Sequence, residues 1–190
     1  MKKSIALVMM AVLLVAASVM GTLAYLTSTD TVKNTFTVGK VAITLDEAKV
    51  TEYGKAVTPA SRVKENTYKL IPGHAYTKDP TVHFAAGSEA SWLFVKVENG
   101  IAAIEADTTI ADQITANDWT ALTGVDGVYY MNVAANNTAA AIDYPVFETF
   151  KLDGEADVSK YANAAVKVTA YAIQADGFTS AAAAWTEVNK

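Results

Sequence analysis

The sequence predicts a mostly β fold, a jelly-roll-like antiparallel β-sandwich with one or two short helices. Apolar and polar residues alternate with period two in several segments, which is typical of strands with one buried face. Turn-forming sequences rich in Gly, Pro and Asp separate these segments at short intervals. No Gly/Ser linker, long charge run or fixed-period repeat divides the chain after its apolar start. Many short strands in an undivided chain indicate a sandwich or a jelly roll.

The first 24 residues have the features of a secretory signal peptide. Two lysines precede an apolar stretch at residues 5–20, and the small residues Thr22 and Ala24 suit cleavage just before Tyr25. A retained membrane helix is the alternative, because residues 4–29 carry no charge and about 20 apolar residues span a bilayer. The sequence that follows is rich in Thr, Ser and Gly and lacks a positively charged flank, which favours cleavage after Ala24.

Cleavage would leave a short N-terminal segment at residues 25–37 and a single domain at residues 38–190. Loss of two lysines leaves 13 basic residues against 20 acidic ones, a net charge of −7. This charge argues against nucleic acid and anionic membranes as partners, so membrane contact is expected only transiently, through the signal peptide. The chain has no cysteine, so a secreted domain of this sequence must be held together by core burial alone.

Two segments show the clearest strand pattern. Within residues 38–50, Val41, Ile43 and Leu45 share one face and alternate with smaller or polar residues. Residues 92–98 are apolar on both faces at their start and on one face at their end, which predicts a central strand. Further strands are expected at residues 67–70, 81–84, 127–133, 146–152 and 165–175.

Helical signals are weaker than strand signals. Residues 102–116 are rich in Ala and Ile with interspersed acids, which indicates a helix crossing one end of the sheets. Residues 179–188 predict a short terminal helix with Thr179 or Ser180 as its N-cap. The aromatic residues of the domain fall at strand spacing, so we expect them to pack in the core.

Few residues are candidates for catalysis. The absence of cysteine excludes a thiol nucleophile and thiolate metal ligands, and no HExxH, G-x-S-x-G or phosphate-binding glycine loop occurs. His74 follows a Pro-Gly turn, and His83 alternates with apolar residues in an expected strand. Because zinc sites need three or more convergent ligands, the two histidines are weak metal candidates. We therefore expect no catalytic residue and no cofactor.

The segment after the cleavage site has a strand-like pattern. Thr27, Thr29 and Thr31 share one parity, whereas Leu26 and Val32 share the other. Thr and Val favour extended backbone, so this chain end could pair with its own domain or with a neighbour. A strand lent to an exposed sheet edge of another copy would generate a filament, because such head-to-tail contacts do not close. The expected donor strand comprises Tyr25, Leu26, Thr27, Thr29, Thr31, Val32 and Lys33.

Two blocks of the sequence resemble a known family. Residues 21–47 contain a small-residue cleavage site, an aromatic residue, the sequence NTFTVG and a strand that ends in acids. Residues 70–100 contain a pattern similar to the family's L-x-P-G-x-x-x-x-K-D turn, with Lys78 and Asp79 in register. The strand at residues 166–178 resembles the family's last core strand. These blocks are similar to the TasA and camelysin (CalY) family, whose precursors are processed by the SipW-type signal peptidase.

This resemblance implies a secreted jelly-roll subunit of biofilm-matrix fibres in Gram-positive bacteria, located in the extracellular matrix or at the cell surface. It also implies that the partner is another copy of the chain, whose sheet the N-terminal strand completes. The camelysin branch has been called a metallopeptidase, so a secreted zinc peptidase using His74 and His83 is the alternative. A monomeric adhesin with exposed aromatic residues is a third possibility. Residues 101–145 match no part of the family pattern.

Overall fold

The structure is a computed structural model that describes residues 39–190. The expected signal peptide at residues 1–24, its cleavage site at Ala24 and Tyr25, and the donor strand at residues 25–33 lie outside the described residues. Within residues 39–190, no helix is both long and apolar enough to cross a membrane.

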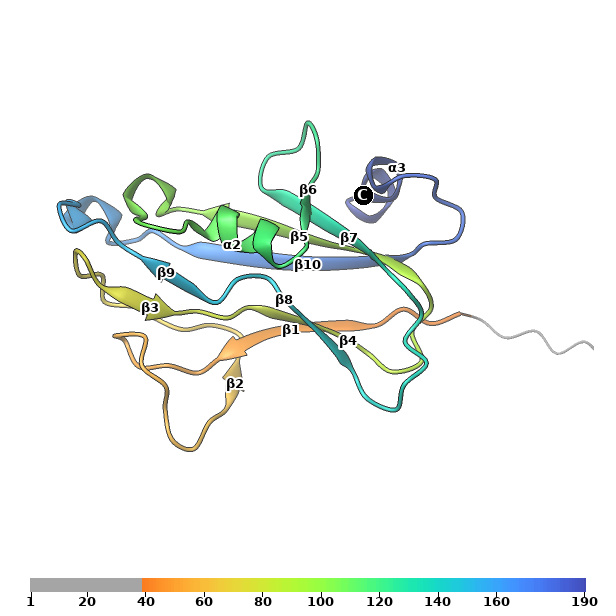
Figure 1. Ribbon diagram of the computed structural model, residues 1–190, viewed down its shortest axis with the longest axis horizontal. Helices are drawn as coiled ribbons and strands as arrows, with labels where there is room; N and C mark the ends of the chain where they lie inside the picture. The colour runs from red at the N-terminus through yellow and green to blue at the C-terminus, as the bar shows by residue number, and fades with distance from the viewer. Residues whose placement is uncertain (1–38) are drawn as a thin grey trace, which may run out of the picture. The chain divides into compact units, whose positions relative to one another are not determined.

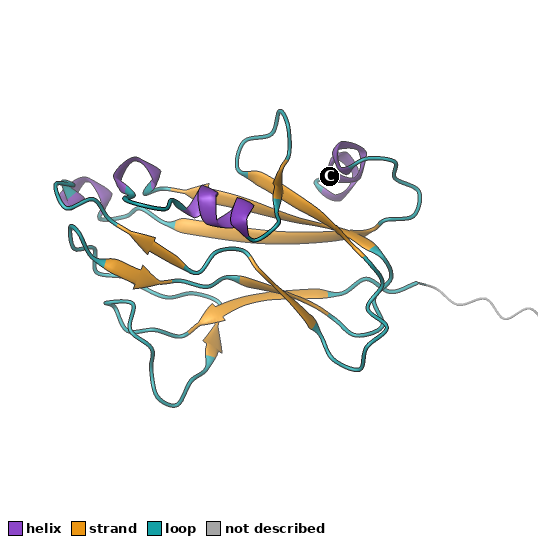
Figure 2. Cartoon of the chain, in the orientation of Figure 1, coloured by secondary structure: helices purple, strands orange, loops and turns teal. Residues whose placement is uncertain are grey.

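Two four-stranded antiparallel sheets form the described domain (Figures 1 and 2). The first sheet has the strand order β2-β1-β4-β8, and the second has the order β10-β5-β7-β6. The strands of the first sheet are β1 (Ile43–Ala48), β2 (Arg62–Val63), β4 (Thr81–Phe84) and β8 (Ile142–Pro145). Those of the second are β5 (Ser91–Asn99), β6 (Thr120–Ala121), β7 (Val128–Val133) and β10 (Val166–Gln174). A separate ribbon pairs β3 (Ala75–Thr77) with β9 (Thr149–Lys151).

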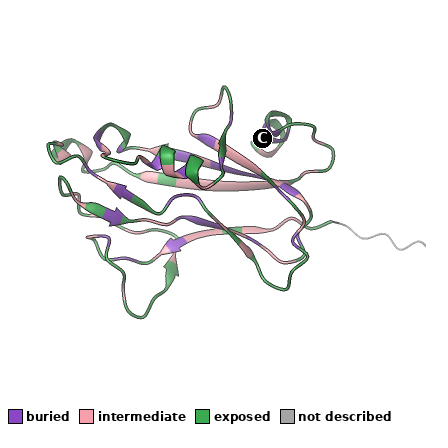
Figure 3. Cartoon of the chain, viewed as in Figure 1, coloured by how far each residue is buried: buried purple, intermediate pink, exposed green. Residues whose placement is uncertain are grey.

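The main hydrophobic core lies between the two sheets (Figure 3). Val82 and Phe84 of β4 face Leu93 and Val95 of β5, and each of these side chains is at most 1% exposed. The strand β5 buries both of its faces and lies between β10 and β7, so the prediction of a central strand is confirmed. Its second face carries Phe94 into a smaller core outside the sheet.

This smaller core lies under the helix α3 (Ala181–Val188), which covers the outer face of the second sheet (Figure 1). Trp185 of α3 packs against Phe94 and Tyr171, with ring centroids 5.3 and 5.2 Å apart. The Ser180 hydroxyl accepts a hydrogen bond from Ala183 N at 3.3 Å, so Ser180 rather than Thr179 is the N-cap. The prediction of a mostly β antiparallel sandwich with short helices is confirmed, whereas a jelly-roll strand order stays a prediction.

The predicted strand at residues 67–70 is wrong, because the segment is held by side-chain contacts and by one backbone hydrogen bond, from Lys69 N to Glu52 O at 2.8 Å, without a strand ladder. Asn66 Nδ2 donates to Ala48 O at 2.8 Å, and its Oδ1 accepts from Val50 N at 3.0 Å. Two residues further on, Tyr68 Oη donates to Thr77 O at 3.0 Å. These side chains bond to backbone groups of β1, of the chain just after β1 and of β3, so the segment runs alongside them without joining a sheet.

The predicted strand at residues 146–152 is reduced to β9. Gln113 takes the place of a strand partner at the start of β9, because its side-chain Oε1 accepts from Glu148 N at 3.2 Å and from Thr149 N at 3.1 Å. The adjacent side chains of Val146 and Phe147 are fully buried without a ladder. A side-chain amide can therefore satisfy a backbone that sequence patterns assign to a strand.

The predicted helix at residues 102–116 is two elements. A short 3₁₀ turn, η1 (Ala102–Ile104), is followed by a break at Asp107, whose φ is 58°. The helix α2 (Ile110–Ala116) then begins at Thr109, which forms a capping box with Asp112. A second 3₁₀ turn, η2 (Val158–Tyr161), precedes β10.

Residues 101–145, which match no part of the family pattern, supply much of the core. Their buried residues include Ile104, Ile110, Ile114 and Trp119, each at most 8% exposed. The strand β8, which the sequence analysis did not predict, belongs to the same region and borders the first sheet. Among the large hydrophobic residues of the described domain, Ile71 is the exposed one. This distribution gives no support to an adhesive aromatic patch on residues 39–190.

Candidate functional site

The main candidate site is a groove of about 850 Å³ at the side of the sandwich where β1 and β10 lie next to each other without pairing. We call it the edge groove. One wall is the end of β1, another is the start of β10, and residues 64–68 form a third. The edge groove is lined by Leu45, Asp46, Glu47, residues 64–68, Leu70, Lys78, Pro80, Ile101, Phe150, Val158, Tyr161, Ala162 and residues 164–168.

The outer edge of β10 carries unpaired backbone groups beside the groove. Gly100 N donates to Ala165 O at 2.9 Å, and Ala175 N donates to Ala90 O at 2.7 Å. The backbone N–H and C=O groups of odd-numbered residues in β10 therefore face β5. Because these directions alternate along a strand, the peptide groups of Val166 and Val168 point to the opposite side. No strand within residues 39–190 pairs with that side of β10.

The edge of β1 is partly covered. The strand β2 pairs with β1 only at Glu47 and Ala48. Ala42 O accepts from Ala85 N at 2.9 Å, so the backbone groups of Ala42 face the side of β4. Because backbone N–H and C=O directions alternate along a strand, those of Ile43 and Leu45 face the groove side. There the Lys64 ammonium group donates a hydrogen bond to Leu45 O. Lys64 therefore occupies a backbone acceptor that a pairing strand would need.

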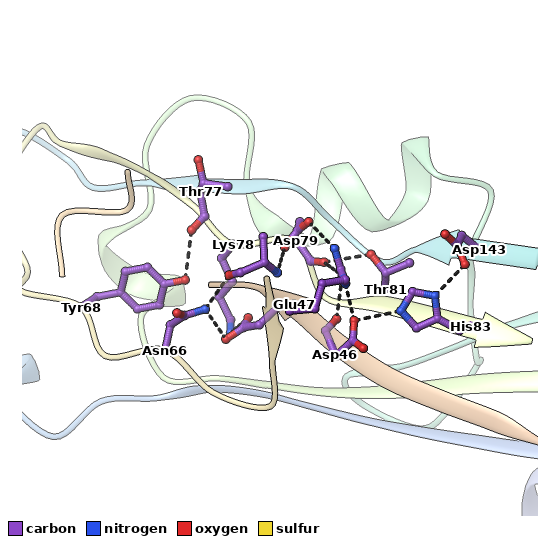
Figure 4. A network of polar contacts seen from close by, with 12 residues as sticks. Asp46, Glu47, Asn66, Tyr68, Thr77, Lys78, Asp79, Thr81, His83 and Asp143 are labelled. Carbon is purple, nitrogen blue, oxygen red and sulfur yellow. Dashed lines mark hydrogen bonds and ion pairs between the residues drawn. The ribbon is translucent and has the colours of Figure 1, made fainter. Parts of the chain in front are cut away.

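A buried ion pair, drawn in Figure 4, lines the edge groove. Lys78 Nζ lies 2.5 Å from Glu47 Oε2, and the two side chains are 11% and 6% exposed. Asn66 Nδ2 donates to Glu47 Oε1 at 3.0 Å. Burial, together with the charges of Glu47 and Asp79, raises the pKa of Tyr68 far above its ordinary value. Tyr68 therefore stays neutral and keeps its phenolic proton as a hydrogen-bond donor.

Asp79, which follows Lys78, contacts the end of β1 and Arg62 of β2. Its Oδ1 accepts from Ala48 N at 2.6 Å, and its Oδ2 lies 3.1 Å from Arg62 Nη1. The same guanidinium group donates through Nε to Asp46. Arg62 thus ties β2 to β1 and to the chain just before β4. The two residues that the family resemblance placed in register, Lys78 and Asp79, therefore have structural partners here.

His83 links three strands on the polar outer face of the first sheet (Figure 4). Its Nε2 lies 2.8 Å from Asp46 Oδ1 of β1, and its Nδ1 lies 2.6 Å from Asp143 Oδ1 of β8. Burial opposes protonation of His83, but the hydrogen bonds and negative charges of the two aspartates outweigh it and raise its pKa. Burial likewise opposes ionisation of Asp46, but Arg62 and His83 outweigh it and lower its pKa.

The two histidines are not brought together by shared partners. His74 Nε2 lies 3.0 Å from Tyr53 O and its ring packs on Tyr76, whereas His83 contacts two aspartates. Among residues 39–190, no cluster of three or more histidine, aspartate or glutamate side chains has the arrangement of a metal site. The predicted weak metal candidates are therefore explained as members of separate hydrogen-bond networks.

The raised pKa of His83 predicts a pH dependence of stability. The contribution of protonated His83 is fully present below its ordinary pKa of 6.5 and is lost as the pH rises through its raised folded-state value. The lowered pKa of Asp46 stabilises the fold above pH 3.8. This contribution is lost as the pH falls below 3.8, through the lowered folded-state value. We expect the free energy of unfolding to fall as the pH rises from about 5.5 to about 8.5, because the contribution of protonated His83 is then lost.

Urea unfolding at the two pH values measures this dependence. His83→Gln should flatten it, because glutamine does not titrate in this range. An unchanged slope in His83→Gln would contradict the assignment.

Sequence reasoning did not identify the residues of the edge groove. Residues 166–168 have an ordinary strand pattern, and the pattern does not reveal whether a strand borders a sheet or lies inside it. Comparisons of the chain with protein-family models, with curated proteins and with solved structures find no match.

Proposed function

We propose that the protein is a secreted structural subunit of extracellular biofilm-matrix fibres that assembles head-to-tail by donating its N-terminal strand, residues 25–33, to the next copy. The observation that supports this most is the open side of the sandwich, where unpaired backbone groups border the edge groove. Such an edge offers hydrogen bonds for an added strand, and an adjoining groove offers sites for its side chains.

The placement of the chain end fits head-to-tail assembly. The described chain starts at Gly39, which lies beside Glu89 and beside Gln174 at the end of β10. The edge groove lies at the start of β10, eight residues away, which is roughly 26 Å at the rise of an extended strand. A segment that leaves one end of the domain and binds the other end of the next copy forms an open filament.

The proposal includes the processing and location of the protein. The SipW-type signal peptidase would cleave after Ala24 in a Gram-positive bacterium and thereby release the donor strand. The mature chain would reside in the matrix or at the cell surface, with membrane contact limited to the signal peptide. A camelysin-like zinc peptidase is less well supported, because His74 and His83 take part in separate networks.

Deletion of residues 25–33 from the mature protein is expected to abolish filaments, because the proposed contact would lose its donor. Electron microscopy and size-exclusion chromatography would show monomers at concentrations where the wild type polymerises. Thermal unfolding is the control, since the deletion should leave the melting temperature of the domain close to that of the wild type.

A full-length variant provides a second comparison. Ser28→Pro/Thr29→Pro removes two successive backbone N–H groups, which point to opposite sides of an extended strand, so one of them lies on the pairing side. This variant should also fail to polymerise. Undiminished filaments from the deleted protein would refute the proposed function.

A further inference from the structure

We infer that the acceptor is the first half of β10, which takes residues 25–33 of a second copy as a fifth strand of its sheet. Leu26 and Val32 of the incoming strand would face the edge groove. This inference rests on the proposed function and adds to it the strand that pairs and the face that the donor presents. It follows from a comparison of the sheet edges and from the lining of the groove.

The other sheet edges in the described domain are short or blocked. The edge strands β2 and β6 have two residues each. The strand β8 has four and ends in Pro145, which has no N–H group and whose carbonyl accepts from Trp119 Nε1 at 2.9 Å. Lys64 covers the Leu45 carbonyl on β1. Short strands, proline and lysine are common means of preventing edge pairing in natural sheets.

By contrast, β10 is neither short nor interrupted by proline, and its lysine, Lys167, is directed to Glu98. It is a nine-residue edge strand without proline, and it pairs with β5 along its whole length. The side chains of Val166 and Val168 pack on the main core, while Lys167 points outward and lies 3.5 Å from Glu98. A strand added beside residues 166–168 would therefore present alternate side chains to the groove and to solvent.

The lining of the groove determines which alternate side chains of the donor strand face inward. Its apolar lining includes Leu45, Ile101 and Phe150. Leu26 and Val32 share a parity and lie roughly 20 Å apart in an extended strand. If this parity faces inward, both residues are buried; the opposite parity would leave them in water.

Charge complementarity favours the same orientation. Asp30 lies between Leu26 and Val32 on the inward parity. The ammonium group of Lys64, an exposed residue at the groove wall, provides a cation for this carboxylate. An ammonium group has three N–H donors, so Lys64 can keep the Leu45 carbonyl and also bind Asp30.

Disulfide trapping tests the assignment in a chain that has no native cysteine. Mature full-length protein carrying Thr29→Cys and Thr169→Cys is polymerised under reducing conditions and then oxidised. Side chains on the same face of paired strands bring their Cβ atoms about 4.5–5.5 Å apart, which approaches the geometry of a disulfide. Thr27→Cys and Thr31→Cys cover neighbouring registers, and Lys167→Cys is a second acceptor position. We expect a reduction-sensitive ladder of covalent oligomers on denaturing gels.

Two matched pairs provide the controls. Ser28→Cys with Thr169→Cys places the thiols on opposite faces, and Thr29→Cys with Thr44→Cys tests β1 instead of β10. Neither should give a ladder. A ladder from the Ser28 pair would overturn the parity, and one from the Thr44 pair would overturn the acceptor strand. A cross-linked monomer would place the segment on its own β10, which also overturns the inference.

Whether the protein forms filaments distinguishes a failure of this inference from a failure of the proposed function. Filaments that give no ladder with Thr169→Cys or Lys167→Cys would overturn the acceptor assignment and leave the fibre function standing. A wild-type protein that forms no filaments would overturn the fibre function, and the acceptor assignment with it.

Discussion

Replacing Lys78 with Met is expected to lower the free energy of unfolding by about 3 kcal/mol, because it leaves a buried carboxylate without its cation. Glu47 is 4% exposed, and only the amide of Asn66 remains to compensate its charge. For a domain of this size, that loss corresponds to a decrease in melting temperature of roughly 6–12 °C. Urea and thermal unfolding at neutral pH measure the change.

A double variant and a surface variant test whether the unpaired buried charge causes the loss of stability in Lys78→Met. Glu47→Leu/Lys78→Met removes both charges and should recover most of the lost stability, since apolar replacements of a buried pair are often neutral. Lys167→Met breaks the exposed pair with Glu98, whose side chains are 69% and 53% exposed; it should change stability by less than about 0.5 kcal/mol. If Lys78→Met is no more destabilising than Lys167→Met, the buried pair is not a major contributor.

Trp119→Ala is expected to have a still larger effect, about 4 kcal/mol. Trp119 is 1% exposed in the main core, and its indole N–H donates to Pro145 O at 2.9 Å. The substitution would leave a large cavity beside α2 and an unpaired carbonyl on β8. The expected decrease in melting temperature is roughly 8–16 °C.

Trp119→Phe separates these two causes. It retains most of the buried volume but loses the hydrogen bond to Pro145, so it should cost about 1–2 kcal/mol. A loss from Trp119→Ala no larger than that from Trp119→Phe would show that the site collapses around the smaller side chain. Equilibrium unfolding in urea would provide both values.

The sequence predicts the strands that depend on local patterning and misses the segments that depend on distant partners. Residues 91–99 form the central strand because they are apolar on both faces, and α3 begins at its expected serine cap. The segments at residues 67–70 and 146–148 have the composition of strands but are held by Asn66 and Gln113. No local pattern shows that a distant amide will replace a strand partner.

The candidate site was less predictable than the fold for a related reason. The motif residues Lys78 and Asp79 can be found in the sequence, but their partners Glu47 and Ala48 N lie on a strand about 30 residues earlier. The edge groove depends on sheet order, which follows from long-range pairing and not from periodicity. The sequence could indicate a donor segment, whereas naming an acceptor required the arrangement of both sheets.

If the proposed assembly holds, the contrast between the open edge of β10 and the proline-capped edge of β8 sets the number of neighbours that each molecule binds. With one extension to give and one place to receive it, each molecule would behave as a bifunctional monomer in a linear polymerisation. Growth then proceeds without branching, and a copy lacking its extension acts as a chain stopper, since it can receive a neighbour's strand but passes none onward. The ratio of intact to clipped molecules would then govern the mean length of the polymer.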